Sequence, residues 1–157
     1  MKRIVLLLTA GALFLTMMPT VAFAAEVKCG GSGDRSSDPV ICTGTNNNDV
    51  IRERNGTNQD EIRALGGSDT IRADLSGSDR DYINAGTGGD TIFTNDRDTR
   101  DEIHCGDGND TATIDVVYDE SGDITAADKV YNCETVKAKD QNGTIVVIDQ
   151  STLPQNQ

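Results

Sequence analysis

The chain contains no tryptophan, and its three tyrosines and three phenylalanines amount to 4% of the residues. So few aromatic side chains exclude a large conventional hydrophobic core, although a length of 157 residues fits one domain. Histidine occurs once, at His104, and the sequence contains neither an HExxH nor a GxSxG motif. With so little general acid and base chemistry near neutral pH, we expect a binding or structural protein and not an enzyme.

Long apolar runs are scarce beyond the first 24 residues. Residues 1–24 begin with Lys2 and Arg3, continue through IVLLLTAGALFL and end in AFA, which is the order of a secretory signal peptide cleaved before Ala25. A membrane anchor is the alternative interpretation of this segment. After cleavage no stretch is long enough to span a bilayer, so we expect a secreted, extracellular protein.

Positive charge is scarce as well. Cleavage removes Lys2 and Arg3 from the 14 Lys and Arg of the chain, which leaves 12 against 26 Asp and Glu and a net charge of −14. This charge argues against nucleic acid as a partner, because phosphate backbones are drawn to basic surfaces. Cations are the natural counter-charge.

All four cysteines lie in the expected mature chain, and an oxidising compartment favours disulfide bonds. The sequence allows three pairings, of which we favour Cys29–Cys42 and Cys105–Cys133 because each closes a local loop near one end of the domain. Zinc binding is the competing interpretation, but the cysteines show no closely spaced pair and only one histidine is present.

A short unit recurs along the chain: a loop ending in aspartate, one variable residue and then an apolar residue. Its aspartates are Asp49, Asp60, Asp69, Asp81, Asp90, Asp101, Asp110 and Asp128. From Asp49 to Asp110 spacings of 11 or 12 residues alternate with spacings of 9, so two units make a coil of 20 or 21 residues. Stacking such coils forms two parallel sheets with two facing inward columns. The columns are Ile51, Ile71, Ile92 and Ala112, and Ile62, Ile83, Ile103 and Val130.

The shorter units AGTGGDTIF (85–93), CGDGNDTAT (105–113) and ALGGSDTIR (64–72) resemble the calcium-binding nonapeptide of the repeats-in-toxin (RTX), or haemolysin-type, family. The resemblance covers roughly residues 42–136 and implies a parallel β-roll. Together with the repeat spacing and the favoured disulfide bonds, it leads us to expect an all-β fold, a right-handed parallel β-roll of about four coils with disulfide-tied ends. The resemblance also implies Ca²⁺ ions held between loops one coil apart. One site would use Asp69 and Asp90 with carbonyls near Gly66 and Thr87, a second Asp90 and Asp110, and a third Asp49 and Asp69, where Asn46 to Asn48 replace the glycines.

The longer units depart from the nonapeptide, because they contain little glycine and carry Arg80, Arg97 and Arg100 beside aspartates. These aspartates are Asp79, Asp81, Asp96, Asp98 and Asp101. An arginine can satisfy neighbouring carboxylates without metal. We therefore expect Ca²⁺ mainly along the short loops and ion pairs along the long ones.

The expected organisation is a signal peptide (1–24), an N-terminal cap (25–41), calcium-binding β-roll repeats (42–113), a last coil with a C-terminal cap (114–148) and a disordered tail (149–157). The expected function is calcium binding coupled to folding, with Ca²⁺ as the ligand. The alternative is a secreted, disulfide-stapled β-solenoid with vestigial calcium sites, whose outer face binds a cell-surface or glycan partner.

Overall fold

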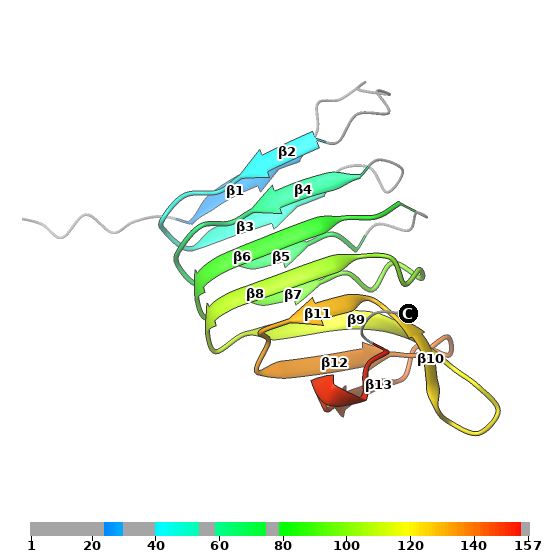
Figure 1. Ribbon diagram of the computed structural model, residues 1–157. Coiled ribbons are helices and arrows are strands. Elements are labelled where there is room, and N and C mark those ends of the chain that lie inside the picture. Colours follow the sequence, from blue (N-terminus) through cyan, green and yellow to red (C-terminus); the bar gives the residue numbers. More distant parts are fainter. Residues whose placement is uncertain (1–23, 30–39, 54–58, 75–78, 155–157) are drawn as a thin grey trace, which may run out of the picture.

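The computed structural model describes residues 24–29, 40–53, 59–74 and 79–154. Residues 1–23 of the predicted signal peptide, 30–39 of the predicted cap and 155–157 of the predicted tail lie outside these ranges. The described chain is an all-β parallel solenoid, in which two sheets face each other and successive coils stack (Figure 1). The predicted fold class is therefore confirmed.

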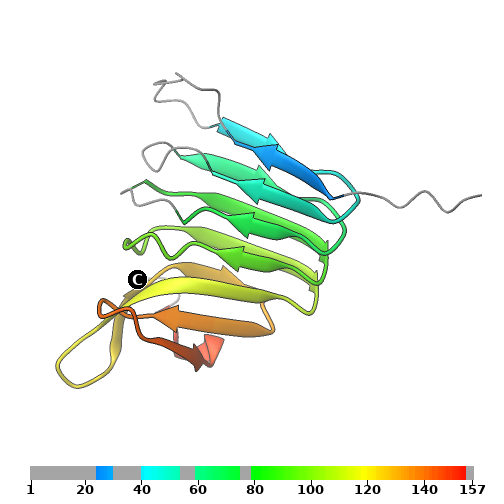
Figure 2. The same cartoon turned by 180° about the vertical axis from the view of Figure 1, so that it is seen from behind.

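The first five coils each contribute one strand to each sheet, and sheet A continues with two further strands. Sheet A contains, in spatial order, β1 (Ala25–Lys28), β3 (Asp49–Arg52), β5 (Thr70–Arg72), β7 (Thr91–Phe93), β9 (Thr111–Tyr118), β12 (Thr135–Lys139) and β13 (Ile145–Ile148). Sheet B contains β2 (Val40–Thr43), β4 (Asp60–Arg63), β6 (Tyr82–Gly88), β8 (Glu102–Gly108) and β11 (Lys129–Tyr131). Figure 2 shows the same stack from behind.

Two antiparallel pairings interrupt this order at the C-terminal end. β10 (Ile124–Ala127) folds back on β9, and β13 folds back on β12. Both hairpins lie at the lower end of the stack in Figure 1. The regular coil-by-coil progression therefore ends there.

Sheet B has five strands, so the solenoid has about one coil more than the four expected. The difference arises at the N-terminal end, in the segment assigned to a cap. β1 pairs in parallel with β3, and β2 pairs in parallel with β4. This segment therefore forms a coil of its own, although it lacks the aspartate repeat from which the coils were counted. The domain boundaries stay predictions in other respects.

The two predicted inward columns are present. In sheet A the strand register aligns Ile51, Ile71, Ile92 and Ala112, and in sheet B it aligns Ile62, Ile83, Ile103 and Val130. All eight side chains have 0% relative exposure. Burying an isoleucine contributes about 1.5 to 3 kcal/mol, so the columns supply much of the hydrophobic stabilisation of a thin core.

Both predicted disulfide bonds are present. Cys29–Cys42 links the ends of β1 and β2 across the first coil, with a Cα–Cα distance of 5.3 Å. Cys105–Cys133 links β8 to the segment after β11, with a Cα–Cα distance of 5.2 Å. The second bond therefore ties the last coil to the one before it.

Residues 149–154, which the sequence assigns to a disordered tail, are folded against the last coil. They include the 3₁₀ helix η1 (Gln150–Thr152), and the Leu153 side chain lies in the core at 6% exposure. The Gln150 side chain donates from Nε2 to the Val130 carbonyl over 2.9 Å. These contacts cover the open end of the solenoid, which explains why this part of the tail is ordered.

Candidate metal centre

Short loops carry the chain from sheet B to sheet A at one edge of the solenoid (left in Figure 1), which we call the short-loop edge. Its aspartates, Asp49, Asp69, Asp90 and Asp110, form a ladder. The backbone N–H of each of the first three donates to Oδ1 of the aspartate one coil further on, over 2.7, 2.8 and 2.7 Å. The Asp110 N–H donates to Glu134 Oε2 over 2.7 Å. These hydrogen bonds hold each carboxylate in a buried position between successive coils.

Asp49 differs from the other three aspartates in the hydrogen bonds that its second carboxylate oxygen, Oδ2, accepts. Asp49 Oδ2 accepts hydrogen bonds from the backbone N–H and the hydroxyl of Thr45, over 2.6 and 3.0 Å. Oδ2 of Asp69, Asp90 and Asp110 is buried and has no hydrogen-bond partner. These three side chains are at most 1% exposed. The chain itself therefore satisfies Asp49, whereas the other three each keep an oxygen available to a cation.

The two carbonyl donors predicted for the first site lie beside each other. Gly66 and Thr87 form a parallel bridge between adjacent coils. The Thr87 carbonyl accepts a hydrogen bond from the Gly67 N–H over 2.9 Å, which leaves one lone pair for another partner. The structure thus brings Gly66, Thr87, Asp69 and Asp90 to one edge, while the presence of an ion among them stays a prediction.

Long loops return the chain from sheet A to sheet B at the opposite edge, which we call the long-loop edge. Among the residues that the structure describes here, three groups of carboxylates place one oxygen from each member within 4.8 Å of the others. The groups are Glu53 with Asp79 and Asp81, Asp79 with Asp96 and Asp98, and Asp98 with Asp101 and Asp128. An arrangement of this kind could hold a metal ion.

A second ladder positions part of this edge. The backbone N–H of Asp60 donates to Asp81 Oδ1 and that of Asp81 to Asp101 Oδ1, both over 2.8 Å, and the Asp101 N–H donates to Asp128 Oδ1 over 3.2 Å. Oδ2 of Asp101 is buried without a hydrogen-bond partner, as are Oδ2 of Asp79 and Oδ2 of Asp98. Unpartnered oxygens therefore occur in each of the three groups.

Burial and mutual repulsion make these carboxylates costly to ionise. Burial, reinforced by Asp79 and Asp60, raises the pKa of Asp81 to about 8. Burial and then the charge of Asp128 raise the pKa of Asp101 to about 10, and burial raises the pKa of Asp128 well above its usual range. At the short-loop edge burial, with Asp69 and Asp110, raises the pKa of Asp90 to about 6. A bound cation would favour the ionised forms that the protein alone disfavours.

One arginine of the long loops, Arg80, forms an ion pair other than the ones predicted with its neighbours Asp79 and Asp81. Arg80 pairs with Glu102 over 3.0 Å, at a surface where the arginine side chain is 53% exposed. Arg97 and Arg100 contact Asp115 and Asp98 through their backbone N–H groups. For Arg80 at least, the side chain turns away from Asp79 and Asp81, so it leaves their charges to another partner.

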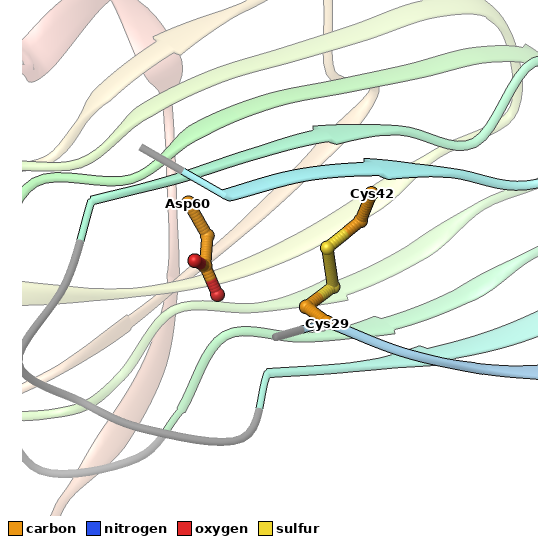
Figure 3. Close-up of side chains that lie close together, drawn as sticks. All are labelled: Cys29, Cys42 and Asp60. Atoms are coloured by element: carbon orange, nitrogen blue, oxygen red, sulfur yellow. A yellow bond between two sulfur atoms is a disulfide. The ribbon is translucent and has the colours of Figure 1, made fainter. Parts of the chain in front are cut away.

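A further group combines Asp60 with the first disulfide bond. Figure 3 shows the Asp60 carboxylate beside the Cys29–Cys42 bridge. Each sulfur is already bonded to the other, so neither is a thiolate that could ligate zinc. In this oxidised state the group does not fit a metal.

The sequence named the short-loop aspartates as metal ligands, which stays a prediction, and it assigned ion pairs instead of metal to the long-loop aspartates that the structure groups together. The signal was present: Asp79 and Asp81, like Asp96 and Asp98, are separated by one residue, and the second pair follows 17 residues after the first, in the long loop of the next coil. Alternate residues of an extended segment point to the same side, so each pair can face inward together.

Comparison of the chain with protein-family models, with curated protein sequences and with solved structures found no match. In the part of the chain that the structure describes, no helix has the length and apolar character needed to cross a membrane. The geometry of the two edges is therefore what bears on the function of the protein.

Proposed function

We propose that the protein is a secreted, RTX-like calcium-binding β-solenoid whose folding is completed by Ca²⁺, with a binding or structural role and not a catalytic one. One observation carries the proposal: buried carboxylate oxygens without hydrogen-bond partners line both edges. They belong to Asp69, Asp90 and Asp110 on one edge and to Asp79, Asp98 and Asp101 on the other. Such oxygens have lost water and gained no protein partner, which is costly unless a cation or a proton joins them.

The chemistry of the donors favours calcium over other common metals. Ca²⁺ takes six to eight oxygen ligands in a flexible geometry; both edges offer carboxylates, and the short-loop edge also offers the carbonyls of the bridged Gly66 and Thr87. Mg²⁺ demands a nearly ideal octahedron and keeps several waters. Zinc prefers sulfur and nitrogen, and both pairs of cysteines form disulfide bonds.

Two features support an extracellular setting for this calcium binding. The N-terminal segment has the order of a secretory signal, and the disulfide bonds are typical of oxidising compartments. The stacked Asp-rich turns are compatible with an RTX-like β-roll. Calcium would then act as a structural ion that the protein acquires on export.

The energetic consequence is a coupling between ion binding and folding. An ion that binds only the folded chain stabilises it by about 2.7 kcal/mol when its concentration is 100 times the dissociation constant. Without ions the buried aspartates must be protonated, as the raised pKa values of Asp81 and Asp101 indicate, or must repel one another. If several ions bind, their contributions to the free energy of unfolding add.

Thermal unfolding followed by circular dichroism tests this function. Protein stripped of metal should gain β signal and melt about 10 °C higher or more in millimolar CaCl₂, because one saturated site already contributes about 2.7 kcal/mol. MgCl₂ at equal ionic strength is the control for charge screening and should have a much smaller effect. Identical spectra and melting curves with and without CaCl₂ would reject calcium-coupled folding.

The alternative function, a glycan- or surface-binding module with vestigial calcium sites, has one observation in its favour. A cavity of about 400 Å³ lies beside the outer face of sheet B and is lined by Gln59, Glu61, Arg80 and Tyr82, among others. It offers one aromatic ring and several hydrogen-bonding groups. This alternative predicts the same melting temperature in the metal-free and calcium-loaded protein, so the experiment above separates the two functions.

A further inference from the structure

The three carboxylate groups of the long-loop edge share members. Asp79 belongs to the first and second groups, and Asp98 belongs to the second and third. A carboxylate has two oxygens, so one aspartate can bind two ions at once. We propose that the long-loop edge holds a row of three divalent cations, with Asp79 and Asp98 as bridging ligands between neighbouring ions.

The third group supplies the clearest geometric support for a ligand. Asp101 is 3% exposed, and its Oδ2 is buried without a hydrogen-bond partner in the group that it forms with Asp98 and Asp128. Its Oδ1 is already engaged by the Asp81 N–H over 2.8 Å. Oδ2 therefore remains to bind an ion shared with the other two carboxylates.

The bridging role follows from the oxygens of Asp79 and Asp98. Oδ2 of each is buried and unpartnered, although neither aspartate is the repeat aspartate of its loop. Asp98 Oδ1 accepts the Arg100 N–H over 2.9 Å, which fixes the side chain and still leaves a lone pair on that oxygen. Both oxygens of Asp98 can thus contribute to ions on either side.

The charges within the three groups match such a row. The groups comprise seven carboxylates, Glu53, Asp79, Asp81, Asp96, Asp98, Asp101 and Asp128, against which three divalent cations supply six positive charges. The nearby Arg80 side chain is committed to Glu102 on sheet B. Cations in a row, separated by bridging carboxylates, would offset the charge of these groups without bringing two ions into contact.

This inference rests on the proposed function and makes a sharper statement about ion number. Equilibrium dialysis against ⁴⁵Ca²⁺ counts the ions bound per chain. Asp98→Asn and Asp79→Asn should each lose two ions, because each removes a bridging ligand, whereas Asp101→Asn should lose one. Asp123→Asn, at an exposed position outside the groups, is the control for charge and should lose none.

The outcomes distinguish the row from the proposed function. If the wild type binds Ca²⁺ but Asp98→Asn and Asp101→Asn lose the same number of ions, the shared ligands are wrong and calcium binding itself stands. If the wild type binds no Ca²⁺, both proposals fail.

A second measurement needs no variant and so avoids the risk that a substitution prevents folding. Mn²⁺ bound in a bridged row should give an electron paramagnetic resonance spectrum broadened by coupling between neighbouring ions. A spectrum of isolated, uncoupled Mn²⁺ ions at saturation would overturn the row.

Discussion

Asp81 and Asp101 are each 3% exposed, and each accepts a backbone hydrogen bond from the preceding coil. A buried carboxylate in this position is stable either as a protonated group or beside a cation. Protons and metal ions therefore compete for these inward-facing carboxylates, and this competition determines how the stability of the protein depends on pH and on metal.

This competition predicts an unusual pH dependence for the metal-free protein. The pKa of Asp81 rises from 3.8 to about 8 on folding, so between these values the folded chain holds a proton that the unfolded chain has released. Stability is then greatest at the acid end and falls as the pH rises toward 8, by up to about 1.4 kcal/mol per pH unit for one such group.

Melting temperatures of desalted, metal-free protein at pH 5 and pH 8 test the sign. The temperature should be lower at pH 8, while in CaCl₂ it should be higher at pH 8 because protons no longer displace the ions. A metal-free melting temperature that rises from pH 5 to pH 8 would show that Asp81 is not held in the protonated form.

The contacts of Arg80 could not be predicted from its position in the sequence. Arg80 lies between Asp79 and Asp81, and its position in the chain predicted that it would neutralise them. Alternation of side-chain direction places it on the opposite side, where it pairs with Glu102 of the next coil. The prediction that Arg80 would pair with its neighbours Asp79 and Asp81 was therefore wrong, because the direction of the side chain, and not its distance along the sequence, determines its partner.

At the scale of elements, the close packing of the short turns requires glycine whether or not a metal ion is bound. Gly88 adopts a φ of 138°, and a Cβ atom there would lie 1.7 Å from the Gly67 carbonyl oxygen of the neighbouring coil. Backbone stacking in these turns thus excludes any side chain. The unpartnered carboxylate oxygens, and not the glycines, are the evidence for cations.

Gly88→Ala should therefore destabilise the calcium-loaded protein by about 2 to 4 kcal/mol, from the backbone strain and the clash with the adjacent turn. Gly143→Ala is the matched control, since Gly143 also has a positive φ, of 84°, but a Cβ atom there would meet no other atom within 4 Å. It should cost about 1 to 2 kcal/mol. Urea unfolding in CaCl₂ measures both, and equal losses would contradict the role of stacking.

The strands were the most predictable elements. Period-two alternation and a constant coil length fix which residue faces inward, so the columns containing Ile71 and Ile83 follow from spacing alone. Loops have no such period. The grouping of Asp79 with Asp98, from different coils, therefore depends on loop paths that spacing does not determine. The first coil was missed for a related reason, because β1 and β2 lack the repeat aspartate.

At the scale of the whole molecule, a thin aliphatic core lies between two acidic edges. The full chain carries a net charge of −12, and its two disulfide bonds secure the first and last coils. Repulsion along the edges opposes stacking, whereas the isoleucine columns and the ladders favour it. Divalent cations would shift this balance along the entire length of the solenoid.

Calorimetric titration of metal-free protein with CaCl₂ at neutral pH tests the central claim most directly, because it measures ion number, affinity and proton release together. We predict saturable binding of more than one ion per chain, with a heat that depends on the buffer because Asp81 and Asp101 give up protons as ions bind. A titration without binding heat in any buffer, with no ion retained after dialysis, would contradict the account.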